Sequence, residues 1–180
     1  MKYKGKKILI LGATSQTVPF VKKAQSMGIE VHVADHLEKS VAKKYADVPV
    51  LINCFHIDSL EKYVLENEID GILLGCADIL LPSYYELCTR TGKYCYAKKE
   101  QIDVFGNKKG LKKKLKEYGL PYIPEYNFSG ENTLSIPIED FPIFVKPVDN
   151  CSSKGMSVCN SQLDLNSCLK HWMPLAQRQF

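Results

Sequence analysis

The segment that decides the fold is Lys7–Asp35, which reads KILILGATSQTVPFVKKAQSMGIEVHVAD. Lys7–Leu11 (KILIL) is an apolar run that ends at Gly12, which is typical of a strand buried on both faces. Val18–Met27 then carries apolar residues at helical spacing, and Glu30–Ala34 (EVHVA) indicates a second short strand. A strand, a glycine turn, a helix and a strand in this order predict the opening βαβ unit of a doubly wound sheet.

The alternation of short strands and helices continues as far as Gly92. Pro49 favours an edge position for the strand that contains it, because proline lacks the N–H that a central strand needs. Strands that alternate with helices imply a mainly parallel, right-handed sheet. We therefore predict an α/β domain with a doubly wound parallel sheet over residues 1–97. Further helices are expected at Leu37–Tyr45, from Asp58 onward and at Ile79–Arg90, and further strands at Val48–Ile52 and Gly71–Leu74.

From Lys98 onward the pattern changes, and a second unit of mixed α+β character is expected over residues 98–180. A basic helix at Lys108–Tyr118 ends at Gly119, and the nearby Pro121 prevents its continuation. The remaining elements are a strand at Phe141–Val145, a Ser-rich turn at Asn150–Lys154, a returning strand at Met156–Cys159 and a helix at Asp164–Trp172.

The composition is that of an ordinary globular protein, since 45% of the 180 residues are hydrophobic and 24% are charged. The formal net charge of +4 is modest, and its excess lysines gather at Met1–Lys7 and Lys108–Lys116, so nucleic acid is not indicated as a partner. The seven cysteines form no C-x-x-C pair and no Cys/His cluster with metal-ligand spacing. Several cysteines lie in apolar segments, which favours a reducing, cytoplasmic compartment. The apolar run at Ile8–Ala13 is too short for a signal peptide or a membrane span.

Phe141–Met156 (FPIFVKPVDNCSSKGM) carries the strongest local signal for a binding site. A predicted strand delivers Lys146 at its end, and a loop of small residues then turns back into a second strand. Small residues let backbone N–H groups approach an anion closely, and hydroxyls and lysines add donors and charge. The stretch therefore predicts a triphosphate site, and the alternative is a polar hairpin with ordinary surface lysines. The loop residues concerned are Ser152, Ser153, Lys154 and Gly155.

The order of these motifs resembles the ATP-grasp superfamily, most closely its carbamoyl-phosphate-synthase-like and biotin-carboxylase-like members. In this family a basic residue opens a helix that ends before Gly-(Ile/Val)-Pro, and Lys108 matches that position ahead of Gly119-Leu120-Pro121. A second lysine at the end of a strand binds the nucleotide phosphates, and Lys146 matches it. The resemblance thus implies that ATP is bound by Lys108, Lys146, Ser152, Ser153, Lys154, Gly155 and Met156, with Met156 near the adenine.

The resemblance also covers the first part of the chain, which is similar to a Rossmann-like pre-ATP-grasp domain. It implies an intact ligase that uses ATP and Mg²⁺ to activate a carboxylate or bicarbonate as an acyl phosphate, which an amine then displaces. The implied partners are therefore small-molecule carboxylates and amines, and a homodimer is compatible with such domains. The family's Mg²⁺ ligands and adenine hinge lie in a later subdomain, and from Ser161 onward this sequence has only Asp164 and no Glu. The expectation is an incomplete, truncated ATP-grasp domain over residues 98–180 that is inactive alone.

The turn after the first strand allows three interpretations. Gly12 followed by an acid, Asp35, suggests a dinucleotide site, but Thr14 and Thr17 replace the later glycines of G-x-G-x-x-G and would crowd a pyrophosphate. Alternatively, Thr14 and Ser15 hold a carboxylate or phosphate of an acceptor molecule at a helix N-terminus. The third interpretation is a capped helix without a ligand.

Gly75 and Asp78 follow the fourth strand, at the edge where open α/β sheets place ligands. Asp78 can equally be a helix cap. The substrate-side candidates are accordingly Gly12, Thr14, Ser15, Asp35, Gly75 and Asp78. The competing hypothesis of a different class is a non-catalytic α/β module that binds a nucleotide or small molecule, followed by an NAD(P)-dependent enzyme.

Overall fold

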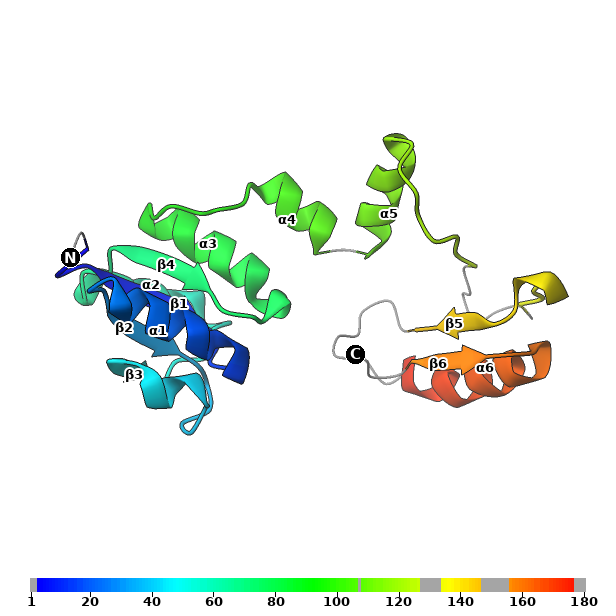
Figure 1. The fold of residues 1–180 in the computed structure, drawn as a ribbon, viewed down its shortest axis with the longest axis horizontal. Coiled ribbons are helices and arrows are strands. Elements are labelled where there is room, and N and C mark those ends of the chain that lie inside the picture. The colour runs from blue at the N-terminus through cyan, green and yellow to red at the C-terminus, as the bar shows by residue number, and fades with distance from the viewer. Residues whose placement is uncertain (1–2, 107, 127–133, 147–155, 177–180) are drawn as a thin grey trace. The chain divides into compact units, whose positions relative to one another are not determined.

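The computed structural model describes residues 3–106, 108–126, 134–146 and 156–176, and it gives no side-chain description for 108–109 and 172–176 (Figure 1). The chain divides into two compact units, Met1–Leu120 and Pro121–Phe180. The boundary predicted from the sequence, after residue 97, assigns the segment 98–120 to the second unit instead, and it stays a prediction.

The first unit is built on a four-stranded parallel sheet in the order β3-β2-β1-β4 (Figure 1). Its strands are β1 (Lys7–Leu11), β2 (Glu30–Ala34), β3 (Val48–Val50) and β4 (Gly71–Leu74). Pro49 lies in β3 at the edge of the sheet, as predicted. The chain winds from β1 to β2 and β3 on one side and then returns to β4 on the other, so the strand order reverses between β1 and β4.

Helices cover both faces of this sheet, which confirms the doubly wound α/β class. On one face, Val21 and Ala24 of α1 (Val18–Ser26) pack with alternate residues of β1 and β2, including Ile10. On the other face, α2 (Ile57–Glu66) and α3 (Leu81–Thr91) pack against Leu9 and Leu11. The continuous apolar runs of β1 and β2 therefore supply both cores.

Three local features of this unit differ from the sequence-based expectation. The helix predicted at Leu37–Tyr45 is limited to the 3-10 helix η2 (Ala42–Tyr45), because side-chain hydrogen bonds hold the preceding residues in a loop. Short 3-10 helices also precede α1 and α3, namely η1 (Ser15–Thr17) and η3 (Asp78–Leu80). An additional helix, α4 (Lys99–Phe105), precedes the basic helix α5 (Lys108–Glu117), which ends before Gly119 at φ 63°.

The second unit is a two-stranded antiparallel hairpin packed on one helix. Its strands are β5 (Ile143–Val145) and β6 (Ser157–Cys159), its helix is α6 (Gln162–Ala176), and η4 (Ile138–Asp140) is a single 3-10 turn. The buried residues Ile136, Cys159 and Leu165 form its core. The predicted hairpin and final helix are thus present. In the parts of the chain that the structure describes, no helix is long and apolar enough to cross a membrane.

Candidate functional site

The β5–β6 hairpin has one face packed on α6 and one face open. Ile143 pairs with Cys159, Phe144 with Val158 and Val145 with Ser157. Because side chains alternate between faces along a strand, Phe144 and Val158 lie on the face opposite to Ile143 and Cys159. The burial agrees with this, since Cys159 is 1% exposed whereas Phe144 is 57% and Val158 is 60% exposed. We call the side with Phe144 and Val158 the open face.

Two residues predicted from the sequence to bind ATP extend this open face. Lys146 follows β5 two residues after Phe144, and Met156 precedes β6 two residues before Val158. The two-residue period puts both on the side of the open face, and both are exposed, Met156 to 38%. The register of β5 and β6, continued by one residue, predicts that Lys146 lies opposite Met156, which is ten positions away in the sequence.

The open face combines exposed apolar side chains with a cation at one end. Phe144, Val158 and Met156 offer the aromatic and polarisable contacts that a planar base uses, and the ammonium of Lys146 is suited to an anion. Phe144 and Val158 were missed by the sequence-based reasoning. The alternation in Ile143–Lys146, where every second residue faces the core, is the signal that could have found Phe144.

The other predicted ATP-binding residues are not placed. Ser152, Ser153, Lys154 and Gly155 lie outside the described residues. Lys108 is the first residue of α5, and its side chain is not described. Their assignment to the nucleotide phosphates therefore stays a prediction.

In the first unit, the predicted substrate-side residues gather at the carboxyl-terminal edge of the parallel sheet. Gly12, Asp35 and Gly75 directly follow β1, β2 and β4. Their amides continue the ladders, from Gly12 N to Ala34 O at 2.9 Å and from Gly75 N to Leu11 O at 2.8 Å. This is the edge at which open α/β sheets bind ligands, next to the place where strand order reverses.

The crevice between β1 and β4 at this edge is filled by protein atoms. Thr17 is fully buried, and its hydroxyl donates to the carbonyl of Gly12 at 3.1 Å. A Cβ atom on Gly75 would lie only 2.8 Å from Gly12 O, Leu11 O and Thr17 Oγ1, so the absent side chain is required by close packing. Thr14 and Thr17 occupy the positions of the later glycines of G-x-G-x-x-G, which disfavours the NAD(P) alternative.

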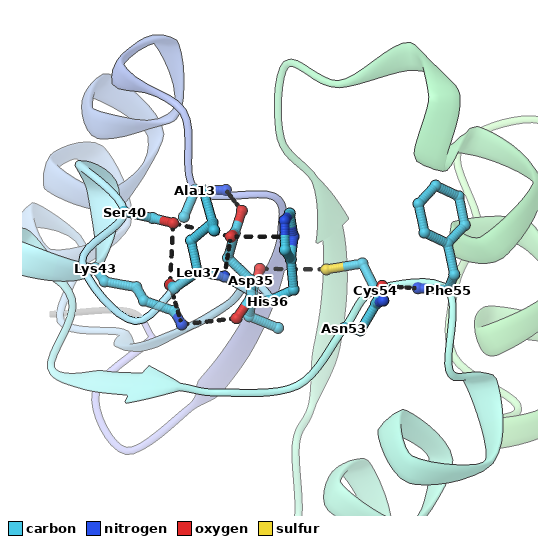
Figure 2. Close-up of polar contacts among 10 residues, drawn as sticks. Ala13, Asp35, His36, Leu37, Ser40, Lys43, Asn53, Cys54 and Phe55 are labelled. Atoms are coloured by element: carbon cyan, nitrogen blue, oxygen red, sulfur yellow. Dashed lines mark hydrogen bonds and ion pairs between the residues drawn. The ribbon is translucent and has the colours of Figure 1, made fainter.

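The carboxylate of Asp35 accepts three hydrogen bonds from this edge (Figure 2). Oδ2 accepts from the amide of Ala13 at 3.1 Å, and Oδ1 accepts from the amide of Leu37 and the hydroxyl of Ser40, both at 2.8 Å. Burial disfavours the charged form, but the hydrogen bonds outweigh it and hold the pKa of Asp35 below its ordinary value. The ionised carboxylate therefore organises the loop, and few of its lone pairs remain for a ligand.

The loop after β2 is also fastened by Lys43, which the sequence-based reasoning did not single out. The residue is only 5% exposed. Its Nζ donates to the carbonyls of Asp35 at 2.7 Å and Leu37 at 2.8 Å (Figure 2). No sequence motif marks this lysine, because it resembles the exposed Lys44 beside it.

The remaining candidates at this edge are open to solvent. Thr14 and Ser15 are exposed, and Thr14, the N-cap residue of η1, makes no side-chain capping bond. The N-cap residue of η3 is Ala77, which has no polar side chain. Asp78 begins η3 and is exposed. As in any helix, the first amide N–H groups of η1 have no carbonyl acceptor within the helix itself. These groups are available to a ligand, and their substrate-side role stays a prediction.

The parallel sheet and the two-stranded hairpin packed on one helix are the features that were compared with solved structures. The fold is that of biotin-carboxylase-like ATP-grasp enzymes, which confirms the resemblance predicted from the motifs. The biotin carboxylase domain dimer of the Hydrogenobacter thermophilus 2-oxoglutarate carboxylase, in complex with MgADP, ADP and bicarbonate, matches with a TM-score of 0.71, 18% identity, 97% coverage of this chain and 42% of that one. The Staphylococcus aureus N5-carboxyaminoimidazole synthetase complexed with ADP matches with a TM-score of 0.70, 20% identity, 93% coverage of this chain and 44% of that one.

Curated relatives are similar at the sequence level. The formate-dependent phosphoribosylglycinamide formyltransferase of Bacillus subtilis (strain 168) is 26% identical over 180 residues, which is 92% of this chain and 44% of that enzyme. The enzyme of the same name from Bacillus velezensis is 26% identical over 178 residues, again 92% of this chain and 44% of its own length. The chain thus spans less than half the length of these relatives. No known protein-family model matches it.

Proposed function

We propose that this chain forms the pre-ATP-grasp domain and the first nucleotide-binding segment of an ATP-dependent carboxylate–amine ligase. The observation that carries the proposal is the open face of the hairpin, where Phe144 and Val158 lie opposite each other and Lys146 and Met156 extend the same side. Phe144 and Val158 are exposed, whereas the small core of this unit is formed by Ile136, Cys159 and Leu165. Adenine fits against the apolar part, and the phosphates fit toward Lys146.

In this proposal the fixed positive charges neutralise the phosphates while a carboxylate or bicarbonate is converted into an acyl phosphate. The cations are Lys146 and, as implied by the resemblance, Lys108 and Lys154. Such charges contribute most when water is excluded around them. An amine of the acceptor then displaces the phosphate. As implied by the resemblance, the Mg²⁺ ligands are assigned to the later subdomain of the intact ligase.

The acceptor is assigned to the carboxyl-terminal edge of the parallel sheet. The exposed groups there are Thr14, Ser15 and Asp78, positioned by Gly12, Asp35 and Gly75. Proteins similar to the chain are named for phosphoribosylglycinamide and for a carboxyaminoimidazole ribonucleotide, and both names denote a ribose phosphate. We accordingly propose a small anionic acceptor. One neighbour is described as a domain dimer, and pairing of this chain in a homodimer is proposed by analogy.

The test is a ¹⁵N NMR titration of the 180-residue chain with a non-hydrolysable ATP analogue and Mg²⁺, followed by NADPH. The analogue should shift the amides of Phe144, Lys146 and Val158 and leave the β1–β4 edge unchanged. Ribose 5-phosphate should shift the amides of Thr14 and Ser15 instead. NADPH binding at Gly12 without any response of the hairpin to the analogue would replace this proposal with a dinucleotide-binding protein.

A further inference from the structure

Lys43 is an unusual feature of the carboxyl-terminal edge. Of the residues that the structure describes, Thr17, His32, Lys43 and Ser83 are the buried polar or charged ones, and Lys43 is the lysine among them. Lysine is rarely buried to this degree, because removing an ammonium group from water is costly. Its hydrogen bonds go to two backbone carbonyls, of Asp35 and Leu37, rather than to a carboxylate.

The ammonium group closes a network that controls the turn after β1. Lys43 holds the carbonyls on both sides of the bend at Asp35–Leu37, and this bend directs the carboxylate of Asp35 at the amide of Ala13. On its other side, the carbonyl of Ala13 accepts from the amide of Ala42, which adjoins Lys43. The N–H and the C=O of Ala13 are therefore both hydrogen-bonded to the segment that follows β2, whereas the next residue, Thr14, is exposed.

A role in global stability alone would not explain the retained charge. Removing Lys43 leaves no carboxylate unpaired, because its hydrogen bonds go to two backbone carbonyls, and methionine has a similar length to lysine. What methionine cannot supply is a set of donors that fixes two carbonyls at once. The buried ammonium group of Lys43 is therefore better explained by the loop conformation that it fixes than by a contribution to the free energy of folding.

We propose that Lys43 is a positioning residue for the acceptor side of the enzyme, acting through Asp35 and Ala13 on the turn that starts at Gly12. The link to the acceptor rests on the proposed function. The positioning itself rests on the five hydrogen bonds that join Lys43, Asp35, Ala13 and Ala42 to one another and to Leu37. Lys43 touches neither nucleotide nor acceptor in this proposal.

The test compares Lys43→Met with Lys44→Met, an exposed neighbour, by amide hydrogen exchange and chemical denaturation of the full chain. Exchange at Ala13 and Leu37 should be at least tenfold faster in Lys43→Met and unchanged in Lys44→Met, while the core amides of Leu9 and Val64 keep their rates in both. Ribose 5-phosphate should then bind at least tenfold more weakly to Lys43→Met. A lysine needed only for stability would instead lower the unfolding midpoint and speed exchange throughout the core, and that result would overturn the proposal.

A second variant tests whether the two charged residues act as one unit. Asp35→Asn should speed exchange at the same amides, and adding Lys43→Met to it should have little further effect, because both act through one loop. Fully additive effects, or unchanged exchange at Ala13 and Leu37, would also overturn the proposal. If these exchange results hold but the ATP analogue leaves Val158 unshifted, the positioning role stands and the proposed function fails.

Discussion

Phe144 and Val158 form a cross-strand pair on the open face of the β5–β6 hairpin, and they are 57% and 60% exposed. In the same hairpin Ile143 pairs with Cys159 on the packed face, where Cys159 is 1% exposed. The two faces of one short ribbon therefore have different roles. Substitutions on them should have separable effects on ligand binding and on folding.

Phe144→Asp should weaken binding of the ATP analogue at least tenfold, because it places a negative charge where the base and phosphates are proposed to lie. The change in unfolding free energy should stay within about 0.5 kcal/mol, since the side chain is already exposed. Calorimetric titration and chemical denaturation measure the two effects. Leu163→Asp is the matched control, because Leu163 is 75% exposed on α6 of the same unit. Equal loss of affinity in both variants would contradict the site.

Leu165→Ala should show the reverse behaviour. Leu165 is 1% exposed in the core between α6 and the hairpin, so its truncation leaves a cavity and should destabilise the second unit by about 2–5 kcal/mol. Denaturation followed by the NMR signals of β5 and β6 measures this loss. Without denaturant, at a temperature where the unit stays folded, affinity for the ATP analogue should be unchanged. A marked loss of affinity would mean that the open face is not an independent binding surface.

Gly75→Ala should destabilise the first unit by about 1–3 kcal/mol. The new Cβ atom would lie 2.8 Å from two backbone carbonyl oxygens and the hydroxyl of Thr17, and the carbonyls cannot move without disturbing the β1–β4 ladder. Gly71→Ala, at the other end of β4, is the control, because nothing lies within 4 Å of its Cβ position. Its effect should be a change of less than about 1 kcal/mol in either direction. Thermal denaturation followed by circular dichroism compares the two.

The hydrogen bonds of Asp35 predict a pH-dependent contribution to stability. Because folding lowers the pKa of this carboxyl below an unfolded value of about 3.9, its contribution is fully present above that value. It is lost as the pH falls through the unfolded value toward the lower folded one. Asp35→Asn should therefore destabilise the chain by about 1–3 kcal/mol at pH 7.

The difference between wild type and Asp35→Asn should shrink as the pH is lowered toward 3, because the protonated aspartic acid then also lacks the ionised acceptor. Urea denaturation at a series of pH values measures this difference. Asp103→Asn, which removes an exposed carboxylate on α4, serves as the control. A difference for Asp35→Asn that does not vary with pH would show that the hydrogen bonds are not made by the ionised form.

The cysteines should differ strongly in reactivity toward iodoacetamide. Burial raises the pKa of Cys54 to about 11 and that of Cys88 to about 12, so both thiols stay protonated at pH 8. Cys76 is exposed at the end of β4. Mass spectrometry should find Cys76 alkylated at least a hundredfold faster than Cys54 and Cys88 in the folded chain, and all three alike in urea. Similar rates without urea would mean that the sheet edge opens readily.

The elements of both units were largely predictable because their signals are local. KILIL and EVHVA are buried on both faces, and Gly28, Gly92 and Gly119 end helices where a positive φ is needed. The loop residues Leu37–Val41 were predicted as the start of a helix at Leu37–Tyr45, because they have no strong turn signal of their own. Its conformation is imposed by Lys43 and by the amide of Ala13, which lies far away in the sequence.

The sequence by itself determined that a hairpin delivering Lys146 follows a parallel α/β unit, because strand periodicity, glycine stops and motif order are properties of neighbouring residues. Only the tertiary structure decided which side chains share a surface. The pairing of β5 with β6 brought Phe144 opposite Val158. The reversal of strand order between β1 and β4 brought Gly75 against Gly12, and the packing of the loop after β2 buried Lys43 rather than Lys44. Each of these depends on contacts between segments distant in the chain, which local patterns do not encode.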